Sequence, residues 1–275
     1  MDGAVTPVTE EVVRSRLDRV TDPELDRSIV ALDYVEAVAI DLPEVHVRFS
    51  LPTAWCSPAF AWMMATDARR EVETLAGVDR AVVELRDHMH ETEINRGVNE
   101  GLSFEASFPD ADGEVDDVWR ELDEKALLSR QYDAVSTLLD AGLTPEQVTR
   151  LTPARLGLDS AADDLKAAAD DASDAPDTAT VFVREGAVGV TVPLDPVRSY
   201  LAKARPLGVV TDSGEPLFRS PDGDPLTTEN FERVHHRTRL TATNMDGQGG
   251  ICAYLHEARH GRDGDAEPVE AESPS

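Results

Sequence analysis

Hydrophobic residues recur first at helical and then at strand spacing near the start of the chain. The helical spacing begins after Thr9, a residue type that caps helices, and stops at Pro23, because the residue before a proline avoids helical backbone angles. Residues 35–40 form a strand candidate, and the alternation of apolar and polar side chains over 45–49 predicts a second strand paired with it. A helix followed by a strand pair is therefore expected.

A second helix and a third strand are predicted next. Ser57 suits the N-cap and Pro58 the first helical position, an apolar stripe continues to Leu75, and Gly77 ends the helix. Apolar side chains on one face of residues 79–85 predict the third strand. The order helix, strand, strand, helix, strand predicts an α+β domain with a mixed three-stranded sheet and its helices on one side.

The pattern changes beyond this domain. Gly97 and Gly101 are expected to break regular structure, and helical periodicity then runs through residues 114–140. The patterns divide the chain into the N-terminal domain (1–90), a helical extension (91–158), an acidic linker (159–177), a small α+β module (178–260) and a disordered tail (261–275).

Three local signals lie within the predicted C-terminal module. Apolar runs on both sides of Gly186 predict a hairpin, and residues 216–218 predict a short strand. Gly249-Gly250 is expected to break the chain before a last helix that ends near His260.

Charge narrows the range of partners. The chain has 275 residues, with 54 acidic and 26 basic side chains and a formal net charge of -28. Such a surface repels nucleic-acid phosphates and anionic lipid, so we expect neither as a partner. Only three basic residues are lysines (Lys125, Lys166 and Lys203), and with the excess of Asp this suggests a halophilic protein that works in high salt. An acidic interaction protein is the competing interpretation.

Targeting and redox signals are sparse. The first residues show neither the basic nor the apolar part of a signal peptide, and no apolar run reaches the roughly 18 residues of a membrane span. A cytoplasmic location is therefore expected. Cys56 and Cys252 are too few for a disulfide scaffold, so each thiol is either buried or reactive.

Cys56 lies between a predicted strand and a predicted helix, one residue before the N-cap candidate Ser57. A helix N-terminus carries positive partial charge and free N–H groups, which favour the thiolate form. Thiolate is the form that binds iron and iron–sulfur clusters. The alternative to a reactive thiolate is that Cys56 is a small buried hydrophobic residue, which is the common role of a single cysteine.

Four motifs surround this cysteine in a fixed order. They are Asp22-Pro23-Glu24-Leu25, Ser28-Ile29-Val30-Ala31-Leu32, Thr53-Ala54-Trp55-Cys56 and Gly77-Val78-Asp79-Arg80-Ala81-Val82. With these motifs, residues 9–87 resemble the metal–sulfur cluster assembly family that includes the PaaD and SufT proteins. Two features depart from the family pattern: Ser57 separates the cysteine from Pro58, and Asp33-Tyr34 replaces the glycine that commonly follows the apolar run.

The resemblance implies that Cys56 handles metal or cluster as a thiolate, with Asp22 and Glu24 close to it. It also implies an iron or iron–sulfur cargo held transiently, and apo-client proteins and assembly machinery as partners. Asp22 is equally a turn residue before proline, and Glu24 a cap of the following segment. Because one thiolate and two carboxylates cannot enclose a four-ligand cluster, a client or a second copy in a homodimer would complete the coordination.

Two further clusters are weaker metal candidates. His88 and His90 follow the third strand at a spacing that places both on one side, and Glu91 adds a carboxylate. Solvated histidines at a strand end are the alternative. Cys252 and His256 lie one helical turn apart, so they could share a metal ion, although a buried apolar stripe explains Cys252 as well.

Three functions remain open at this level. The first is an accessory factor, not an enzyme, that hands iron or clusters to clients through Cys56. The second is an interaction or regulatory module that binds no metal, such as an accessory of a di-iron monooxygenase. The third is a metal-dependent enzyme that uses His88, His90 and Glu91.

Overall fold

The computed structural model describes residues 7–109, 115–160, 177–183 and 186–260, and it divides into two compact units. The first unit combines residues 1–115 with 247–275, and the second comprises 116–246. The divisions expected at residues 90 and 178 fall elsewhere, because the helices over Glu91–Glu100 and Phe104–Ser107 belong to the first unit. The last turns of the chain's final helix belong to it as well. The predicted linker and tail lie mostly outside the described residues.

The first unit begins with α1 (Glu10–Leu17), which Thr9 caps by accepting a hydrogen bond from the Val12 N–H at 3.3 Å. Two short strands follow, β1 (Thr21–Asp22) and β2 (Arg27–Ser28), which pair antiparallel. They fold the segment between the first helix and the main sheet into a tight loop.

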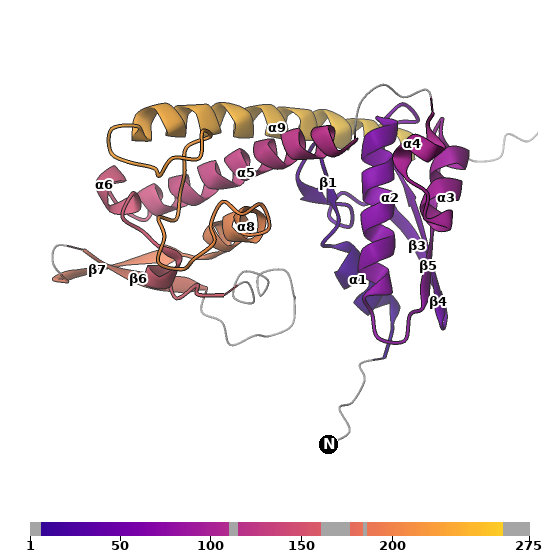
Figure 1. The fold of residues 1–275 in the computed structure, drawn as a ribbon, viewed down its shortest axis with the longest axis horizontal. Coiled ribbons are helices and arrows are strands. Elements are labelled where there is room, and N and C mark those ends of the chain that lie inside the picture. Colours follow the sequence, from indigo (N-terminus) through magenta and orange to yellow (C-terminus); the bar gives the residue numbers. More distant parts are fainter. Residues whose placement is uncertain (1–6, 110–114, 161–176, 184–185, 261–275) are drawn as a thin grey trace, which may run out of the picture. The chain divides into compact units, whose positions relative to one another are not determined.

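The main sheet has three strands in the order β3-β4-β5. Strands β3 (Val35–Asp41) and β4 (Glu44–Ser50) pair antiparallel, whereas β5 (Arg80–Arg86) runs parallel to β4. A parallel pair needs a crossover connection, and α2 (Pro58–Glu73) supplies it (Figure 1). The α+β class and the mixed sheet predicted from the sequence are confirmed.

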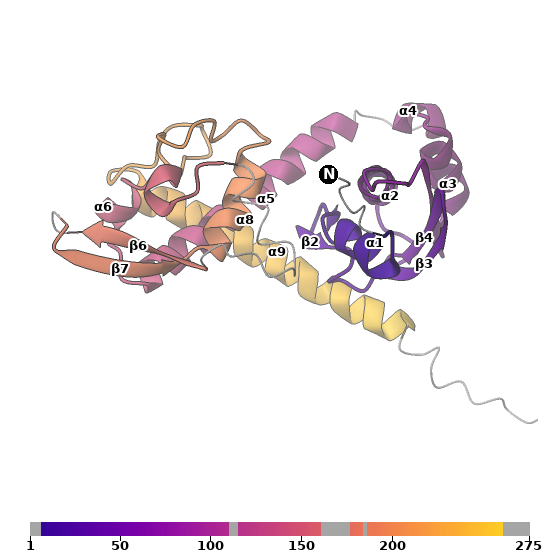
Figure 2. The same cartoon turned by 90° about the horizontal axis from the view of Figure 1, so that it is seen from below.

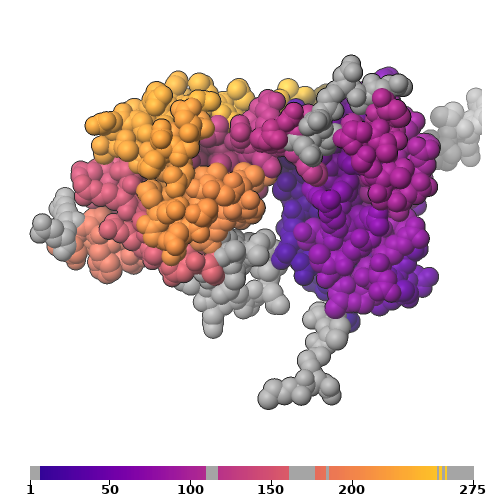
Figure 3. All heavy atoms as spheres, in the orientation of Figure 1, coloured from indigo at the N-terminus to yellow at the C-terminus, as the bar shows by residue number. Residues whose placement is uncertain are grey.

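Alternation along the strands builds one core. Inward side chains of β4 and β5 are fully buried, and α2 packs Met63, Met64, Ala68 and Val72 into the same core. The buried strand residues are Val45, Val47, Phe49, Ala81, Val83 and Leu85. Atoms of α2 and α3 form the visible face of this unit in the space-filling view (Figure 3).

The expected break at Gly97 is wrong, because helix α3 (Glu91–Glu100) runs through it. A Cβ at Gly97 would lie 2.5 Å from the Trp62 ring, so only glycine permits this approach between α3 and α2. Gly101 ends α3 with φ of +72°, a left-handed C-cap that glycine adopts without strain. Helix α4 (Phe104–Ser107) follows.

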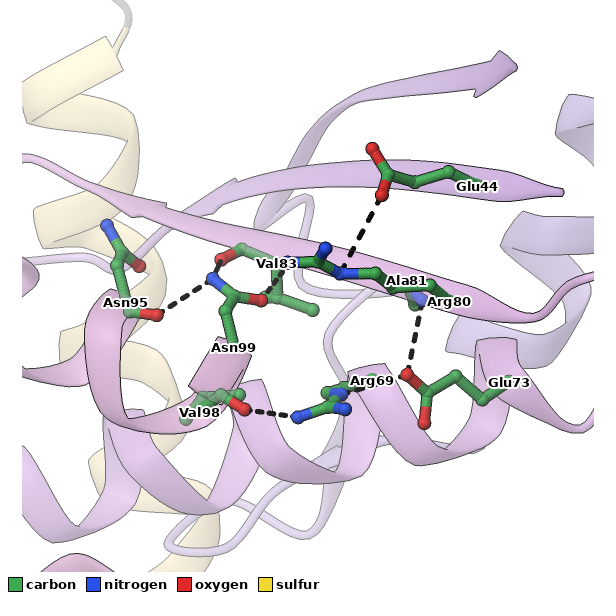
Figure 4. A network of polar contacts seen from close by, with 9 residues as sticks. All are labelled: Glu44, Arg69, Glu73, Arg80, Ala81, Val83, Asn95, Val98 and Asn99. Atoms are coloured by element: carbon green, nitrogen blue, oxygen red, sulfur yellow. Dashed lines mark hydrogen bonds and ion pairs between the residues drawn. The ribbon is translucent and has the colours of Figure 1, made fainter. Parts of the chain in front are cut away.

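Helix α3 also covers the free edge of β5 (Figure 4). Asn99 accepts from the Val83 N–H at 2.9 Å and donates to the Val83 carbonyl at 2.8 Å. Asn95 does the same with Leu85, at 2.8 and 3.0 Å. The two amides therefore take the place of a fourth strand.

The second unit contains α5 (Val115–Asp140), α6 (Pro145–Val148), a 3-10 helix η1 (Pro153–Leu156), β6 (Thr178–Val183), β7 (Val188–Pro193), α8 (Asp195–Ala204) and the first part of α9 (Phe231–His260). The predicted hairpin is confirmed as the antiparallel pair β6–β7. The predicted strand at 216–218 is wrong: in the part of the chain described, this segment contributes only a single bridge between Arg219 and Pro225.

The expected break at Gly249-Gly250 is also wrong, because α9 continues through both glycines to His260 (Figure 2). A helical glycine costs about 1 kcal/mol relative to alanine, an amount that packing readily offsets. Among the described residues, no helix is long and apolar enough to cross a membrane.

Candidate functional site

Cys56 lies in the turn between β4 and α2, one residue before the N-cap position of α2. Its sulfur is 3.4 Å from the Thr53 hydroxyl, and its N–H points at the Thr53 carbonyl at 3.5 Å. Pro58 occupies the first helical position as predicted, while Ser57 makes no side-chain capping bond. The thiol is partly exposed at a strand-to-helix turn, and the side chain of neighbouring Trp55 is 76% exposed.

The segment after β5 holds this turn in place. Strands β4 and β5 are parallel, so the chain leaves both at the same edge of the sheet. The Met89 N–H donates to the Ala54 carbonyl at 3.1 Å, and buried His88 places Nε2 2.9 Å from the Cys56 carbonyl. His88 Nδ1 accepts from the His90 N–H, so the ring proton is on Nε2 and donates to Cys56.

Asp22 is buried and belongs to a local turn. Its Oδ1 accepts hydrogen bonds from the N–H groups of Glu24 at 2.9 Å and Leu25 at 3.1 Å. Its Oδ2 accepts from the Tyr34 hydroxyl at 3.3 Å. Burial raises the pKa of this carboxyl above its ordinary value, and the three hydrogen bonds oppose that rise. Asp22 therefore organises the turn, as its place before a proline suggested.

The Tyr34 hydroxyl, which donates to Asp22, has a raised pKa. Burial raises the pKa of the Tyr34 hydroxyl first, and the negative charge of Asp22 adds to the effect. The sulfurs of Cys252 and Cys56 contribute as well, so both lie within electrostatic range of this hydroxyl. Asp33, directly before Tyr34, has φ of +58°, the left-handed region that glycine favours and Asp tolerates.

Comparisons with known proteins agree with this geometry. A family model described as iron-sulfur cluster assembly protein matches residues 10–85, which span α1 to β5. An uncharacterized protein of Methanocaldococcus jannaschii is 36% identical over 95 residues, which are 34% of this chain and 97% of that protein. The chain belongs to the iron–sulfur cluster assembly protein family.

Membership places the protein in iron–sulfur cluster assembly in general, in an accessory role. Within the described ranges, no group of three or more His, Cys, Asp and Glu side chains could hold a metal ion. The sulfur of Cys56 is nevertheless a soft ligand of the kind that iron and clusters take.

Of the two histidines predicted from the sequence, His88 meets the Cys56 turn. His88 reaches it through the Cys56 carbonyl, and both of its ring nitrogens take part in hydrogen bonds with the backbone. His90 stands directly before α3, and its ring meets Phe108 edge-on with centroids 5.6 Å apart. A metal at His88 would have to displace one of these hydrogen bonds.

The predicted pair of Cys252 and His256 stays a prediction, and the surroundings of Cys252 raise its pKa. Burial raises the pKa of its thiol to about 11, and the carboxylates of Asp22 and Glu24 and the sulfur of Cys56 add to the rise. His256 lies one turn further along α9, and its side chain is outside the described part of the chain. On the same helix, Gly249 packs beside Leu25, so α9 lies against the assembly-family motif at the other end of the sequence.

Sequence reasoning missed two residues of this site, Thr53 and Tyr34. Thr53 was visible only as the first letter of the cysteine motif, and no pattern marked its hydroxyl as a neighbour of the sulfur. Tyr34 stood out as a departure from the family pattern, which was the one available signal.

Proposed function

We propose that this iron–sulfur cluster assembly protein receives iron or an iron–sulfur cluster at Cys56 and hands it to client proteins. The observation that carries the proposal is the partly exposed Cys56 sulfur in a turn fixed from both sides, by the Thr53 contacts and by His88. A single accessible thiol held in a fixed position leaves most of the bound metal or cluster open to an incoming protein. The ligands of that protein can then replace the thiol.

The Cys56 surroundings also support a carrier over a catalyst. The thiol stands beside an exposed aromatic side chain, Trp55, which a client can contact. Asp22, the carboxylate of the family motif, already accepts three hydrogen bonds and is buried, so it positions its own turn instead of acting on a substrate.

Anaerobic reconstitution with iron and sulfide tests the proposal. Wild type should bind both and restore activity to an apo iron–sulfur reporter enzyme, while Cys56→Ser should lose transfer by about tenfold or more, in the range seen when metal-site residues are removed. Ser57→Cys combined with Cys56→Ser is the matched control, because it keeps the thiol count and moves the sulfur into the N-cap position. Equal uptake and transfer by wild type and Cys56→Ser would refute the proposal and favour an interaction module that binds no metal.

A further inference from the structure

Two large apolar side chains are exposed beside the Cys56 turn. Trp55, directly before the cysteine, is 76% exposed, and Met89, in the segment after β5, is 54% exposed. The two segments lie against each other, because the Met89 N–H donates to the Ala54 carbonyl at 3.1 Å. Cys56 itself is partly exposed. We call Trp55 and Met89 the Trp55–Met89 patch.

The backbone on both sides of this patch is held in place. Asp87 has φ of +56°, a left-handed conformation that turns the chain directly after β5. The next residue, His88, is buried and places Nε2 2.9 Å from the Cys56 carbonyl. In the cysteine turn, the Trp55 N–H donates to the Thr53 hydroxyl at 3.3 Å. Both exposed side chains therefore come from anchored backbone, and their exposure is part of the fold.

The chemistry of the two side chains points to a protein partner. Tryptophan is highly buried on average, because its large apolar surface is unfavourable in water. It is also one of the residue types that carry most of the binding energy at protein interfaces. Methionine is unbranched and polarisable, so it adapts to irregular partner surfaces. Together the two side chains suit an apolar pocket on another protein.

The charge around the patch restricts the kind of partner. Residues 53–60 and 87–95, which contain and flank the patch, include neither lysine nor arginine but three carboxylates, those of Asp87, Glu91 and Glu93. A second copy of the chain, with its formal net charge of -28, would bring like charges together at this surface. A protein with basic side chains around its apolar pocket is attracted instead.

We infer that the Trp55–Met89 patch is the docking surface for client proteins. The client it fits has an apolar pocket rimmed by lysine or arginine, and its cluster-binding cysteines lie beside that pocket. This inference rests on the proposed function, since Cys56 holds the cargo that the client must reach. Because Trp55 is the neighbour of Cys56 in the chain, a client that seats Trp55 in its pocket brings its cysteines close to the cargo.

Transfer to two kinds of acceptor tests the inference on the full chain. Each protein is loaded anaerobically with iron and sulfide and then mixed with an apo iron–sulfur reporter enzyme that has a basic surface around its cluster cysteines. A second sample is mixed with bipyridine, a small neutral iron chelator that needs no docking surface. Trp55→Ala should slow transfer to the reporter about tenfold or more and Met89→Ala about threefold or more, as loss of interface anchors does. Uptake and release to bipyridine should stay within about twofold of wild type, because neither side chain is a proposed ligand of the cargo.

Leu42→Ala is the matched control for the loss of an exposed apolar side chain. Leu42 is 50% exposed in the turn between β3 and β4, at the end of β4 opposite the Cys56 turn. This variant should transfer to both acceptors like wild type. Trp55→Phe, which keeps an aromatic anchor, should restore part of the rate that Trp55→Ala loses.

A second reporter with the same cluster type and an acidic surface tests the charge of the partner. It should accept cargo more slowly than the basic reporter, and added KCl should narrow the difference by screening the charges. Equal rates for the two reporters at low salt would contradict a basic rim on the client.

Three outcomes overturn the inference. In the first, Trp55→Ala transfers to the basic reporter like wild type. In the second, it loses release to bipyridine as strongly as transfer to the reporter, so Trp55 holds the cargo instead of docking a client. In the third, sedimentation shows a wild-type dimer that Trp55→Ala dissociates, so a second copy covers the patch.

Binding without cargo separates this inference from the proposed function. Cargo-free wild type should bind the basic apo reporter measurably by interferometry, and Trp55→Ala should bind it about tenfold or more weakly. If this difference is found but wild type transfers no cargo, the proposed function fails and the docking surface stands. If Cys56 proves necessary for transfer but binding does not depend on Trp55, the proposed function stands and the inference fails.

Discussion

His88 fixes the Cys56 turn through a hydrogen bond whose donor can be assigned. Replacement by phenylalanine keeps a ring of similar bulk, but leaves the Cys56 carbonyl without its donor and the His90 N–H without its acceptor. We expect His88→Phe to lower the free energy of unfolding by about 1–3 kcal/mol. Amide hydrogen exchange of residues 53–57 should also accelerate.

His46 offers a matched control, since it is an exposed histidine on β4 paired with Glu44. His46→Phe should change the free energy of unfolding by no more than about 0.5 kcal/mol, as surface substitutions usually do. Urea unfolding and hydrogen exchange measure both variants. If His46→Phe accelerates hydrogen exchange of residues 53–57 as much as His88→Phe does, His88 does not stabilise the turn.

A site residue could be predicted where it stands in a recognisable local motif. Cys56 and Asp22 stand in contiguous motifs, and a strand-to-helix turn follows from the residues on either side. The approach of α9 to Leu25 depends on packing by a segment more than two hundred positions later in the sequence, and no local pattern encodes such a contact. For Cys252, sequence spacing suggests only a pair with His256, because residues four apart on one helix are neighbours.

At the level of elements, α3 completes the sheet with side chains. A free strand edge invites pairing with other chains, and the amides of Asn95 and Asn99 occupy that edge of β5. Asn99→Ala removes the partners of the Val83 N–H and carbonyl, so we expect a loss of about 1–3 kcal/mol in the free energy of unfolding. It should also promote concentration-dependent association, measurable by light scattering.

Glu100→Ala is the control for this substitution, because Glu100 is exposed on the next position of the same helix. Alanine favours helices at least as well as glutamate, so stability should stay within about 0.5 kcal/mol of wild type. A monomeric Asn99→Ala protein with wild-type stability would contradict the proposed role of α3.

The predicted elements succeeded where alternation was strong and failed at two glycine positions. Strands β4 and β5 follow from apolar and polar positions that repeat every two residues. Breaks are expected at Gly97 and at Gly249-Gly250 because glycine disfavours helix. In the structure a Cβ at Gly97 would clash with the Trp62 ring, so packing requires glycine there, whereas a Cβ at Gly249 would make only ordinary contact with Leu25. Packing requirements of this kind are invisible to local propensity.

At the scale of the whole molecule, the formal charge of -28 is the dominant property. The family match and the Cys56 site lie in the first unit, while the acidic excess is a property of the full chain. Repulsion among 54 carboxylates opposes folding, and dissolved salt screens it. The chain should therefore depend on ionic strength for stability.

Thermal unfolding across a salt series tests this dependence. Between about 0.1 and 1 M ionic strength the Debye length falls from about 10 to 3 Å, so the unfolding midpoint should rise over this range and then level off as repulsion is fully screened. Because sulfate also stabilises by exclusion from the protein surface, KCl and K₂SO₄ should be compared at equal ionic strength. Screening predicts that the two curves coincide in the lower part of the range. A midpoint that does not respond to KCl would show that the carboxylates are already balanced within the fold, and that high salt is not the condition for which this surface is suited.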